Sequence, residues 1–326
     1  MSIRPREVLI IVTLIVSAAT LALVWTAAEP QQHTDDGALR VMTFNVHQGF
    51  DNSGRTNPVP FLKAIEAYRP DLVSLQESES NRLLSSQYDL VLWLARRTGM
   101  HYYYGPGTGE NIYGVSILSA YPLHNQRVYH LPAEEDPRVA VQGELDVNGT
   151  PVRFLAVHLG LSVPDRYHQM KYIFNEQIKK HTGPLIIAGD FNTLESENFI
   201  SEQKPDTRND GWDENRLREF ADRQAQNTER NIAELAAEEQ FFGMRTYRRF
   251  MTDSWRMLNP DDHDAYSWLD TNVYLGKPQD ELESSVRIDY VFVSDHFSVE
   301  SARIVADENA LAGSDHLPVI VDLKLK

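Results

Sequence analysis

The sequence of 326 residues contains no cysteine, which excludes disulfide bonds and thiolate metal sites. Basic residues are in deficit, because 31 Lys and Arg stand against 47 Asp and Glu, for a net charge of −16. An acidic surface does not attract polyanions, so the overall charge gives nonspecific nucleic-acid binding no support. A local basic patch can still override that global sign, so a nuclease is disfavoured without being excluded.

Charge is also missing from residues 8–25, an apolar run that follows Arg4 and Arg6. Eighteen helical residues span about 27 Å, close to the thickness of the hydrocarbon core of a bilayer. The basic flank comes first, so we expect a single-pass, membrane-anchored protein whose main domain is extracytoplasmic. A cleaved signal peptide with its small residues at 26–28, and hence a secreted protein, is the alternative; the length of the run favours a retained anchor over residues 1–28.

A polar linker at residues 29–38 leads into one α/β domain at residues 39–326, in which short apolar runs mix with helical patterns. Helices are expected at residues 60–68, 83–99 and 164–180. Strands are expected at residues 40–46, 71–77, 102–104, 112–118, 128–131, 139–147, 152–157, 184–188, 288–293, 297–305 and 319–323. Residues 201–245 are polar and helix-prone, which predicts an inserted helical segment, either a rim over the site or a solvated surface decoration.

Residues 189–192 (GDFN) follow one of these strands. Asp190 and Asn192 are two residues apart on an extended or just-turning chain, so their side chains point the same way. One anion and one carboxamide are enough to hold a water molecule and contact a phosphate oxygen. The alternative is an Asx turn at the end of the strand, which Asp and Asn form readily.

Polar side chains stand in or next to several other strand-like runs: Asn45, Glu77, His158, Asp289 and the pair Asp315-His316. An Asp directly before a His can hold the imidazole in one tautomer, which is how a general base is oriented.

In this order the motifs resemble those of the endonuclease/exonuclease/phosphatase superfamily, also called DNase I-like, over essentially residues 40–326. The resemblance implies a four-layer α/β/β/α sandwich of two packed mixed β-sheets and a phosphoric ester hydrolase. Within the superfamily, residues 43–50 (TFNVHQGF) and 111–119 (NIYGVSILS) look most like the C-terminal domain of eukaryotic proteins that remodel the lipid of GPI anchors.

Glu77 ends a strand with no Lys or Arg nearby in the sequence, and a buried carboxylate needs a partner or a metal. The surplus of carboxylates and amides favours a hard cation, Mg²⁺ or in its place Mn²⁺. The resemblance makes Glu77 the principal ligand and Asn45 its neighbour, with Asp315 or Asp289 as further contacts. The alternative for Glu77 is an ion pair with an Arg distant in the sequence.

The resemblance also implies catalytic roles. His316, oriented by Asp315, would handle the proton of the attacking water, and Asp190 is the alternative base. Asn192 would hold the phosphate or the water. His158 would stabilise the pentacovalent phosphate or serve the leaving oxygen, although a lone His at a strand end can be purely structural. Asp289 would pair with a catalytic His, for which His158 is the expected partner.

Arg138 begins a strand and could clamp a phosphate with two hydrogen bonds. The alternative is a salt bridge to Glu134 or Glu135. Asn111 and Tyr113 are further residues expected near the phosphate. Many nucleases of the superfamily carry Asp or Glu two residues after the first Asn; this chain has His47, which could bind metal or phosphate or cap the loop.

The sequence thus predicts a membrane-anchored, Mg²⁺-dependent phosphodiesterase that acts on phospholipid or phosphoinositol-type headgroups. A metal-dependent endonuclease is the first alternative. A catalytically inactive binding module is the second, and it is disfavoured because the whole set of motif residues is present. The oligomeric state is not predicted.

Overall fold

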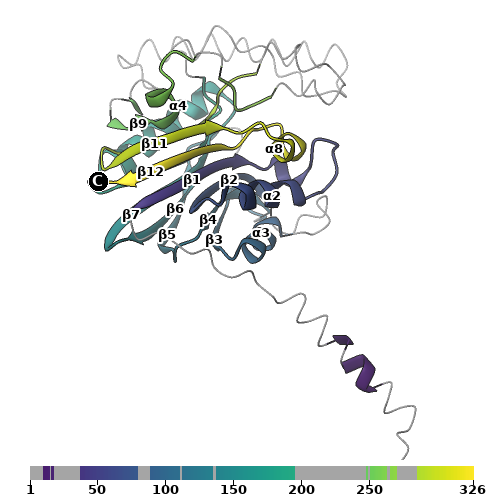
Figure 1. The fold of residues 1–326 in the computed structure, drawn as a ribbon. Coiled ribbons are helices and arrows are strands. Elements are labelled where there is room, and N and C mark those ends of the chain that lie inside the picture. The colour runs from purple at the N-terminus through teal and green to yellow at the C-terminus, as the bar shows by residue number, and fades with distance from the viewer. Residues whose placement is uncertain are drawn as a thin grey trace, which may run out of the picture.

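The computed structural model describes residues 10–14, 16–17, 37–79, 89–110, 112–134, 137–194, 247–248, 250–262, 265–269 and 285–326. Two six-stranded sheets pack face to face within them (Figure 1). The first sheet has the order β11 (Phe297–Ile304), β12 (Val319–Leu325), β1 (Ala38–Asn45), β2 (Leu72–Glu79), β4 (Tyr113–Ser119) and β3 (His101–Pro106). The second has the order β5 (His124–Leu131), β6 (Arg138–Val147), β7 (Thr150–His158), β8 (Leu185–Asp190), β10 (Asp289–Val293) and β9 (Thr252–Asp253).

Both sheets are mixed, because β1 pairs with β2 and β7 with β8 in parallel, whereas the other neighbours are antiparallel. The prediction of an α/β chain with two packed mixed sheets is therefore confirmed. A hydroxyl joins the two layers: Ser74 Oγ on β2 donates to the carbonyl oxygen of Ala188 on β8, at 2.9 Å.

The central strands are apolar at almost every position because both of their faces are buried. Along β7, Phe154 and Ala156 belong to the core between the sheets, whereas Leu155 and Val157 belong to a separate core under α4 (Val163–Ile173). This alternation follows from the two-residue period of a strand. It places the hydrophobic residues of β7 against two different layers.

Helices cover the outer faces of the sheets. On the first sheet lie α2 (Val59–Tyr68) and α3 (Leu90–Thr98), whose buried sides include Phe61 and Leu94. On the second lies α4, continued by the π-helical turn η3 (Phe174–Ile178), so the helix expected at residues 164–180 is present. Figure 1 shows α2 and α3 together on one side and α4 on the other. The short elements are η1 (His47–Gly49), α7 (Ser254–Leu258) and α8 (Glu308–Gly313).

No helix among the described residues is both long and apolar enough to cross a bilayer. Residues 10–14 and 16–17 are helical, and the remainder of the predicted anchor lies outside the described residues. The predicted insertion at residues 201–245 and most of the predicted linker also lie outside them.

Candidate active site

Three neighbouring strands of the second sheet deliver His158, Asp190 and Asp289 side by side. In the strand register His158 is paired with Asp190, and Asp190 is paired with Asp289. Residues paired across neighbouring strands point to the same face of a sheet, so the three side chains converge. Each has an exposed fraction of 2% or less. Burial of this many ionisable groups requires that they compensate one another.

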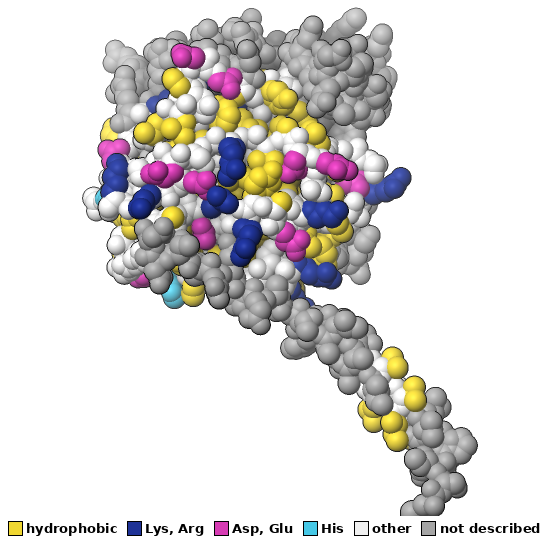
Figure 2. All heavy atoms as spheres, in the orientation of Figure 1, with side chains coloured by type: hydrophobic (Ala, Val, Ile, Leu, Met, Phe, Trp, Pro, Cys, Tyr) yellow, Lys and Arg dark blue, Asp and Glu magenta, His cyan; other side chains and the backbone are white. Residues whose placement is uncertain are grey.

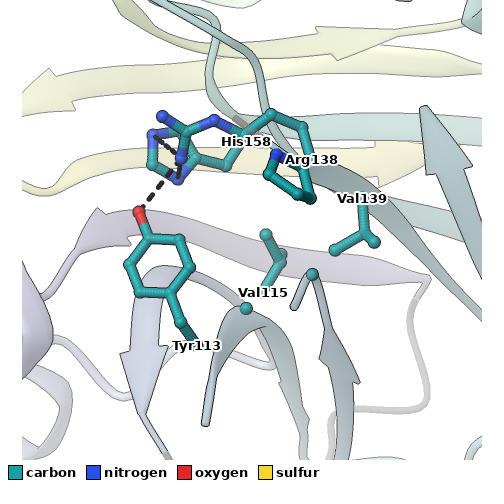
Figure 3. A pocket seen from close by; sticks show the side chains of 8 residues that line it. Tyr113, Val115, Arg138, Val139 and His158 are labelled. Atoms are coloured by element: carbon teal, nitrogen blue, oxygen red, sulfur yellow. Dashed lines mark hydrogen bonds between the residues drawn. The ribbon is translucent and has the colours of Figure 1, made fainter. Parts of the chain in front are cut away.

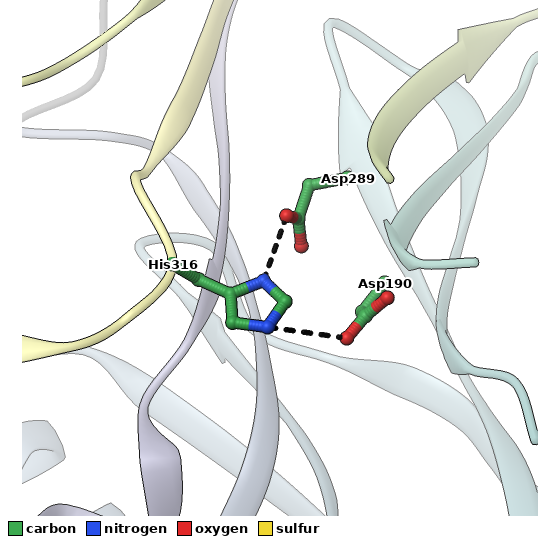
Figure 4. Close-up of side chains that lie close together, drawn as sticks. All are labelled: Asp190, Asp289 and His316. Atoms are coloured by element: carbon green, nitrogen blue, oxygen red, sulfur yellow. Dashed lines mark hydrogen bonds and ion pairs between the residues drawn. The ribbon is translucent and has the colours of Figure 1, made fainter. Parts of the chain in front are cut away.

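His316 comes from the first sheet, shortly before β12, and completes this group (Figure 4). Its Nδ1 lies 2.8 Å from Oδ2 of Asp289, and its Nε2 lies 3.7 Å from Oδ2 of Asp190. Asp289 Oδ2 also accepts a hydrogen bond from Ser267 Oγ at 2.7 Å. The imidazole is therefore held between two carboxylates.

Two expected pairings are corrected by this geometry. The carboxylate that orients His316 is Asp289 and not its sequence neighbour Asp315, and the partner of Asp289 is His316 and not His158. Asp315 instead accepts a hydrogen bond from Trp268 Nε1 at 3.3 Å. The reason is local, because the chain bends at Asp315 and the two neighbouring side chains leave the backbone in different directions. An Asp next to a His in the sequence is thus poorly placed to reach its imidazole.

The carboxylates keep His316 protonated. Burial disfavours the imidazolium, but Asp289 and Asp190 outweigh burial and raise the pKa of His316 to about 10. Burial, helped by the charge of Asp289, raises the pKa of Asp190 to about 6, although His316, Asn192 and Asn45 stabilise its anion. At neutral pH the site therefore holds an imidazolium beside an ionised Asp190 that can accept a proton near that pH.

Glu77 enters the site from a distortion of β2. The pairing of β2 with β4 shifts register between Leu75 and Ser78, and Glu77 has a φ of 52°. A bulge of this kind re-aims a side chain beside an active site. The Glu77 carboxylate lies 3.4 Å from Nδ2 of Asn45 through Oε1 and 3.3 Å from Nε2 of Gln48 through Oε2.

The surroundings of Glu77 fit a hard cation. Within the described residues its carboxylate receives hydrogen bonds from amide groups, and no Lys or Arg there forms an ion pair with it. Asn45 connects it to the other catalytic candidates, because Asn45 Nδ2 lies 3.1 Å from Asp190 Oδ2 and 3.5 Å from His316 Nε2. A carboxylate with amide neighbours and without a cationic partner has the donor set of a Mg²⁺ or Mn²⁺ site.

Asp190, Asp289 and His316 also form a group compact enough for a metal, with one ligand atom of each within 4.8 Å of the others. A metal there would require a lone pair on His316. Both imidazole nitrogens face carboxylate oxygens, and the pKa of His316 is raised by them, so the ring is a hydrogen-bond donor. Glu77 is the better metal ligand on this ground.

Arg138, His158 and Tyr113 line a small, half-open pocket next to this group (Figure 3). Nη1 of Arg138 lies 3.0 Å from the Tyr113 hydroxyl and 3.2 Å from His158 Nδ1, and Nε2 of His158 lies 3.6 Å from Asp190. Burial and the charges of Arg138 and His316 hold the pKa of His158 well below its usual value, so its ring is neutral. Burial and the charge of Glu77 raise the pKa of Tyr113, which keeps its hydroxyl protonated.

The remaining predicted residues stand as follows. The Asx turn expected as the alternative at residues 189–192 is present, because the Asn192 backbone N–H donates to Asp190 Oδ1 at 2.8 Å. Asn192 Nδ2 donates to the carbonyl oxygen of Leu159 at 2.9 Å, and the expected contact with phosphate or water stays a prediction. The backbone N–H of His47 donates a hydrogen bond to Asn45 Oδ1 at 3.1 Å and so caps the loop. Asn111 and Glu135 lie outside the described residues.

Sequence reasoning missed three contributors. Ser267 donates to Asp289 from a segment without any motif, so no sequence signal marks it. Gln48 reaches Glu77 from a turn with positive φ, which only the structure reveals. Ser314 donates to the carbonyl oxygen of Asn45 (2.7 Å) and accepts from the His316 backbone N–H (3.1 Å). Its position directly before Asp315-His316 is a signal that could have found it.

The chain is similar to proteins of known sequence and of known structure. The protein cwh43 of Schizosaccharomyces pombe is 28% identical over 129 residues, which are 39% of this chain and only 13% of cwh43. Exodeoxyribonuclease III of Haemophilus influenzae is 25% identical over 303 residues, 88% of this chain and 100% of that enzyme. The crystal structure of an endonuclease/exonuclease/phosphatase from Beutenbergia cavernae superposes with a TM-score of 0.58 at 21% identity, covering 88% of this chain and 72% of the other, and shows the same fold.

The family model of the endonuclease/exonuclease/phosphatase family matches residues 42–316, a span that begins on β1 and ends at His316. Among the described residues, that span contains β1 from Met42 onward, every later strand before β12, and every residue of the site described above. The chain therefore belongs to the Endonuclease/Exonuclease/phosphatase family.

Proposed function

We propose that this protein is a metal-dependent phosphodiesterase whose single catalytic domain comprises residues 39–326. The observation that carries the proposal is the arrangement of His316 between Asp289 and Asp190, with a neutral His158 on the other side of Asp190. It offers a proton acceptor, a fixed cation and a hydrogen-bonding imidazole within one buried group. Hydrolysis of a phosphate ester needs these three functions at one phosphorus atom.

Asp190 is the general base in this mechanism. Both nitrogens of His316 face carboxylates, which keep the ring doubly protonated. An imidazolium has no lone pair with which to accept a proton, so His316 cannot be the base. Asp190 is ionised at neutral pH and accepts the proton of the attacking water. His316 stays charged and stabilises the negative charge that builds up on the phosphoryl oxygens.

The phosphate-binding side consists of Arg138, Tyr113 and His158. The guanidinium of Arg138 supplies donors and positive charge for the phosphoryl oxygens, and the Tyr113 hydroxyl orients it. His158 is neutral, so it can hydrogen-bond a phosphoryl oxygen or the leaving oxygen without adding a second imidazolium to the site. Asn192 lies at the edge of the same group and would hold the phosphate or the water.

Glu77 is the residue we propose to hold the metal, with Asn45 beside it. When bound, Mg²⁺, or Mn²⁺ in its place, would polarise a phosphoryl oxygen and offset charge in the transition state. The site's own residues supply the proton transfer and the orientation of the substrate.

The proposed substrates are phospholipid or phosphoinositol-type headgroups, presented to an extracytoplasmic domain by the N-terminal apolar segment. The net charge of −16, the uncharged run at residues 8–25 and the similarity of part of the chain to cwh43 support this choice. In vesicles of phosphatidylinositol or sphingomyelin, the full chain should release phosphorylated headgroup with Mg²⁺ and stop when EDTA is added. Absence of release from any lipid, together with efficient DNA cleavage, would refute the lipid assignment.

An endonuclease is the second candidate function, because exodeoxyribonuclease III matches over 88% of this chain and over its own full length. It requires a basic surface along the site. On the face shown in Figure 2, basic and acidic side chains are interspersed. The test is nicking of supercoiled plasmid at several salt concentrations, because electrostatic DNA binding weakens steeply with salt. Nicking at a rate far above lipid turnover would favour this alternative.

A further inference from the structure

The loop at residues 159–161, directly after His158, is held by side chains. Most strand-to-helix loops satisfy their polar backbone groups in water. Here these groups bond to protein side chains instead. The Leu159 carbonyl accepts from Asn192 Nδ2 (2.9 Å), and the Gly160 N–H donates to Gln169 Oε1 (2.8 Å). The carbonyls of Gly160 and Leu161 both accept from Arg166 Nη1. The backbone after His158 is thus held both by Asn192, which follows β8, and by two residues of α4.

Arg166 is the unusual member of this set. It lies in the first turn of α4, is 2% exposed, and its Nη1 donates to backbone carbonyls. Burial lowers the pKa of Arg166 to about 10, with Asp190 and Asp165 acting in the opposite direction, so the guanidinium is charged at neutral pH. A buried charge carries a desolvation cost of several kcal/mol, which the hydrogen bonds of Arg166 to the loop carbonyls help to offset.

The contact between this loop and α4 is very close. A Cβ on Gly160 would lie 3.1 Å from Cβ of Asp165 and 3.4 Å from Nε2 of Gln169, so a larger residue would push the loop away. Asp165 Oδ1 also accepts the backbone N–H of Glu134 at 2.8 Å, in the loop that leads to Arg138. The first turn of α4 therefore contacts the loop that follows His158 and the loop that precedes Arg138.

We propose that Arg166 is a positioning residue for His158, acting through the backbone of residues 159–161. The proposal rests on the role of His158 in the proposed phosphodiesterase. Reactive groups have to be held within about 0.5 Å of their productive positions, and His158, as the last residue of β7, needs a supporting layer where the strand ends. Arg166 supplies this layer for the end of β7, and Gln169 assists it.

The kinetic test compares Arg166→Ala, Arg166→Lys and the matched control Arg153→Ala with the wild-type full chain on a p-nitrophenyl phosphodiester. Arg153 lies on β7 and binds Glu144 at 2.8 Å, away from the site. Arg166→Ala should lower kcat by about 10–100-fold with KM within about threefold, since a misplacement of about 1 Å costs up to that much. Guanidinium ions in the buffer should restore part of kcat, Arg166→Lys should keep more activity than Arg166→Ala, and Arg153→Ala should stay within about twofold of wild type.

The second test does not depend on activity. Amide hydrogen exchange of Gly160 and the ¹H–¹⁵N resonances of the His158 ring should change in Arg166→Ala, with exchange at least about tenfold faster, and should not change in Arg153→Ala. If Arg166→Ala fails to fold, Arg166→Lys and Gln169→Leu, which each remove one tie, take its place. Wild-type exchange, ring resonances and kcat in these variants would overturn the proposal. If the wild type showed no hydrolase activity but amide exchange of Gly160 still depended on Arg166, only the proposed function would be refuted.

Discussion

Nδ1 of His316 lies 2.8 Å from Oδ2 of Asp289, and this hydrogen bond joins the two sheets. Asp289 begins β10 in the second sheet, whereas His316 lies three residues before Val319, the first residue of β12 in the first sheet. Ser267 donates to the same carboxylate oxygen at 2.7 Å and fixes its position. The charge of His316 is therefore set by how the two sheets pack.

Asp289→Asn should move the alkaline limb of the pH–rate profile to lower pH. The charge of Asp289 favours the imidazolium of His316, so its loss lowers the pKa of His316 from about 10, by at least roughly one unit for a contact of this kind. Activity requires protonated His316, so it should disappear at a lower pH than in wild type. The measurement is kcat/KM between pH 6 and 11, with the exposed Asp146→Asn as control. An unshifted alkaline limb would show that His316 is not the group that titrates.

The stability of the wild type should also depend on His316. The folded-state pKa of His316 is raised to about 10, above the value near 6.5 of an unfolded chain. Its stabilising contribution is therefore complete below about pH 6.5 and is lost as the pH rises through 10. Urea unfolding of wild type and His316→Gln at pH 6 and pH 10 should give a larger fall for wild type. Parallel losses in the two proteins would contradict the ion pairing in the folded state.

Much of the site was predictable because its residues follow a local rule. His158 and Asp190 stand at the ends of β7 and β8, two parallel apolar strands, and the ends of such neighbours meet at one sheet edge. The pairing of Asp289 with His316 was not predictable, since it depends on the antiparallel register of β10 with β8 and on the packing of the sheets. A sequence contains no local pattern for either.

Other features depend on backbone distortion or long-range contacts. Glu77 was identifiable as a strand-end carboxylate, but the bulge and the φ of 52° that turn it toward Asn45 are not encoded by any glycine or turn motif. Arg166 lies in a helix whose amphipathic pattern gives no reason for a buried cation. The contacts of Glu77 with Asn45 and Gln48 form when β1 pairs with β2, and those of Arg166 form when α4 packs on the second sheet. Both depend on segments that are distant in the sequence or on the local fold.

Glu77→Gln should remove the response to Mg²⁺ and lower kcat by at least about 10²-fold. The substitution keeps the shape of the side chain and one of its two acceptor oxygens but removes the anion that we propose to hold the metal. Mg²⁺ titrations of activity and calorimetric Mn²⁺ binding should both show the loss. Glu176→Gln, at an exposed ion pair with Lys180, serves as the control. Undiminished Mn²⁺ binding in Glu77→Gln would show that a group other than Glu77 holds the metal.

Arg138→Met should weaken substrate binding and raise the pKa of His158. The charge of Arg138 is one of the causes that, after burial, hold the pKa of His158 far below its usual value. Without it we expect the His158 ring to titrate at a measurably higher pH in NMR, and KM to rise by about tenfold through loss of a charged phosphate contact. Arg127→Met on β5 is a matched, exposed control. If Arg138 formed only a structural salt bridge, KM would be unchanged in Arg138→Met.

Gly189→Ala should destabilise the fold and displace Asp190. A Cβ at Gly189 would lie 2.0 Å from the carbonyl oxygen and 2.7 Å from Cγ2 of Val157 on the paired strand β7, and backbone cannot yield as a flexible side chain does. Overpacking of a core costs about 1–3 kcal/mol or more.

Urea unfolding should therefore give a lower midpoint for Gly189→Ala, and kcat should fall more than the unfolded fraction explains, because Asp190 follows directly. Gly109→Ala is the control, since a Cβ there meets no atom within 4 Å. If Gly189→Ala kept the wild-type midpoint, β7 and β8 would have to lie farther apart than the register of His158 with Asp190 requires, and the convergence of those two side chains would lose its basis.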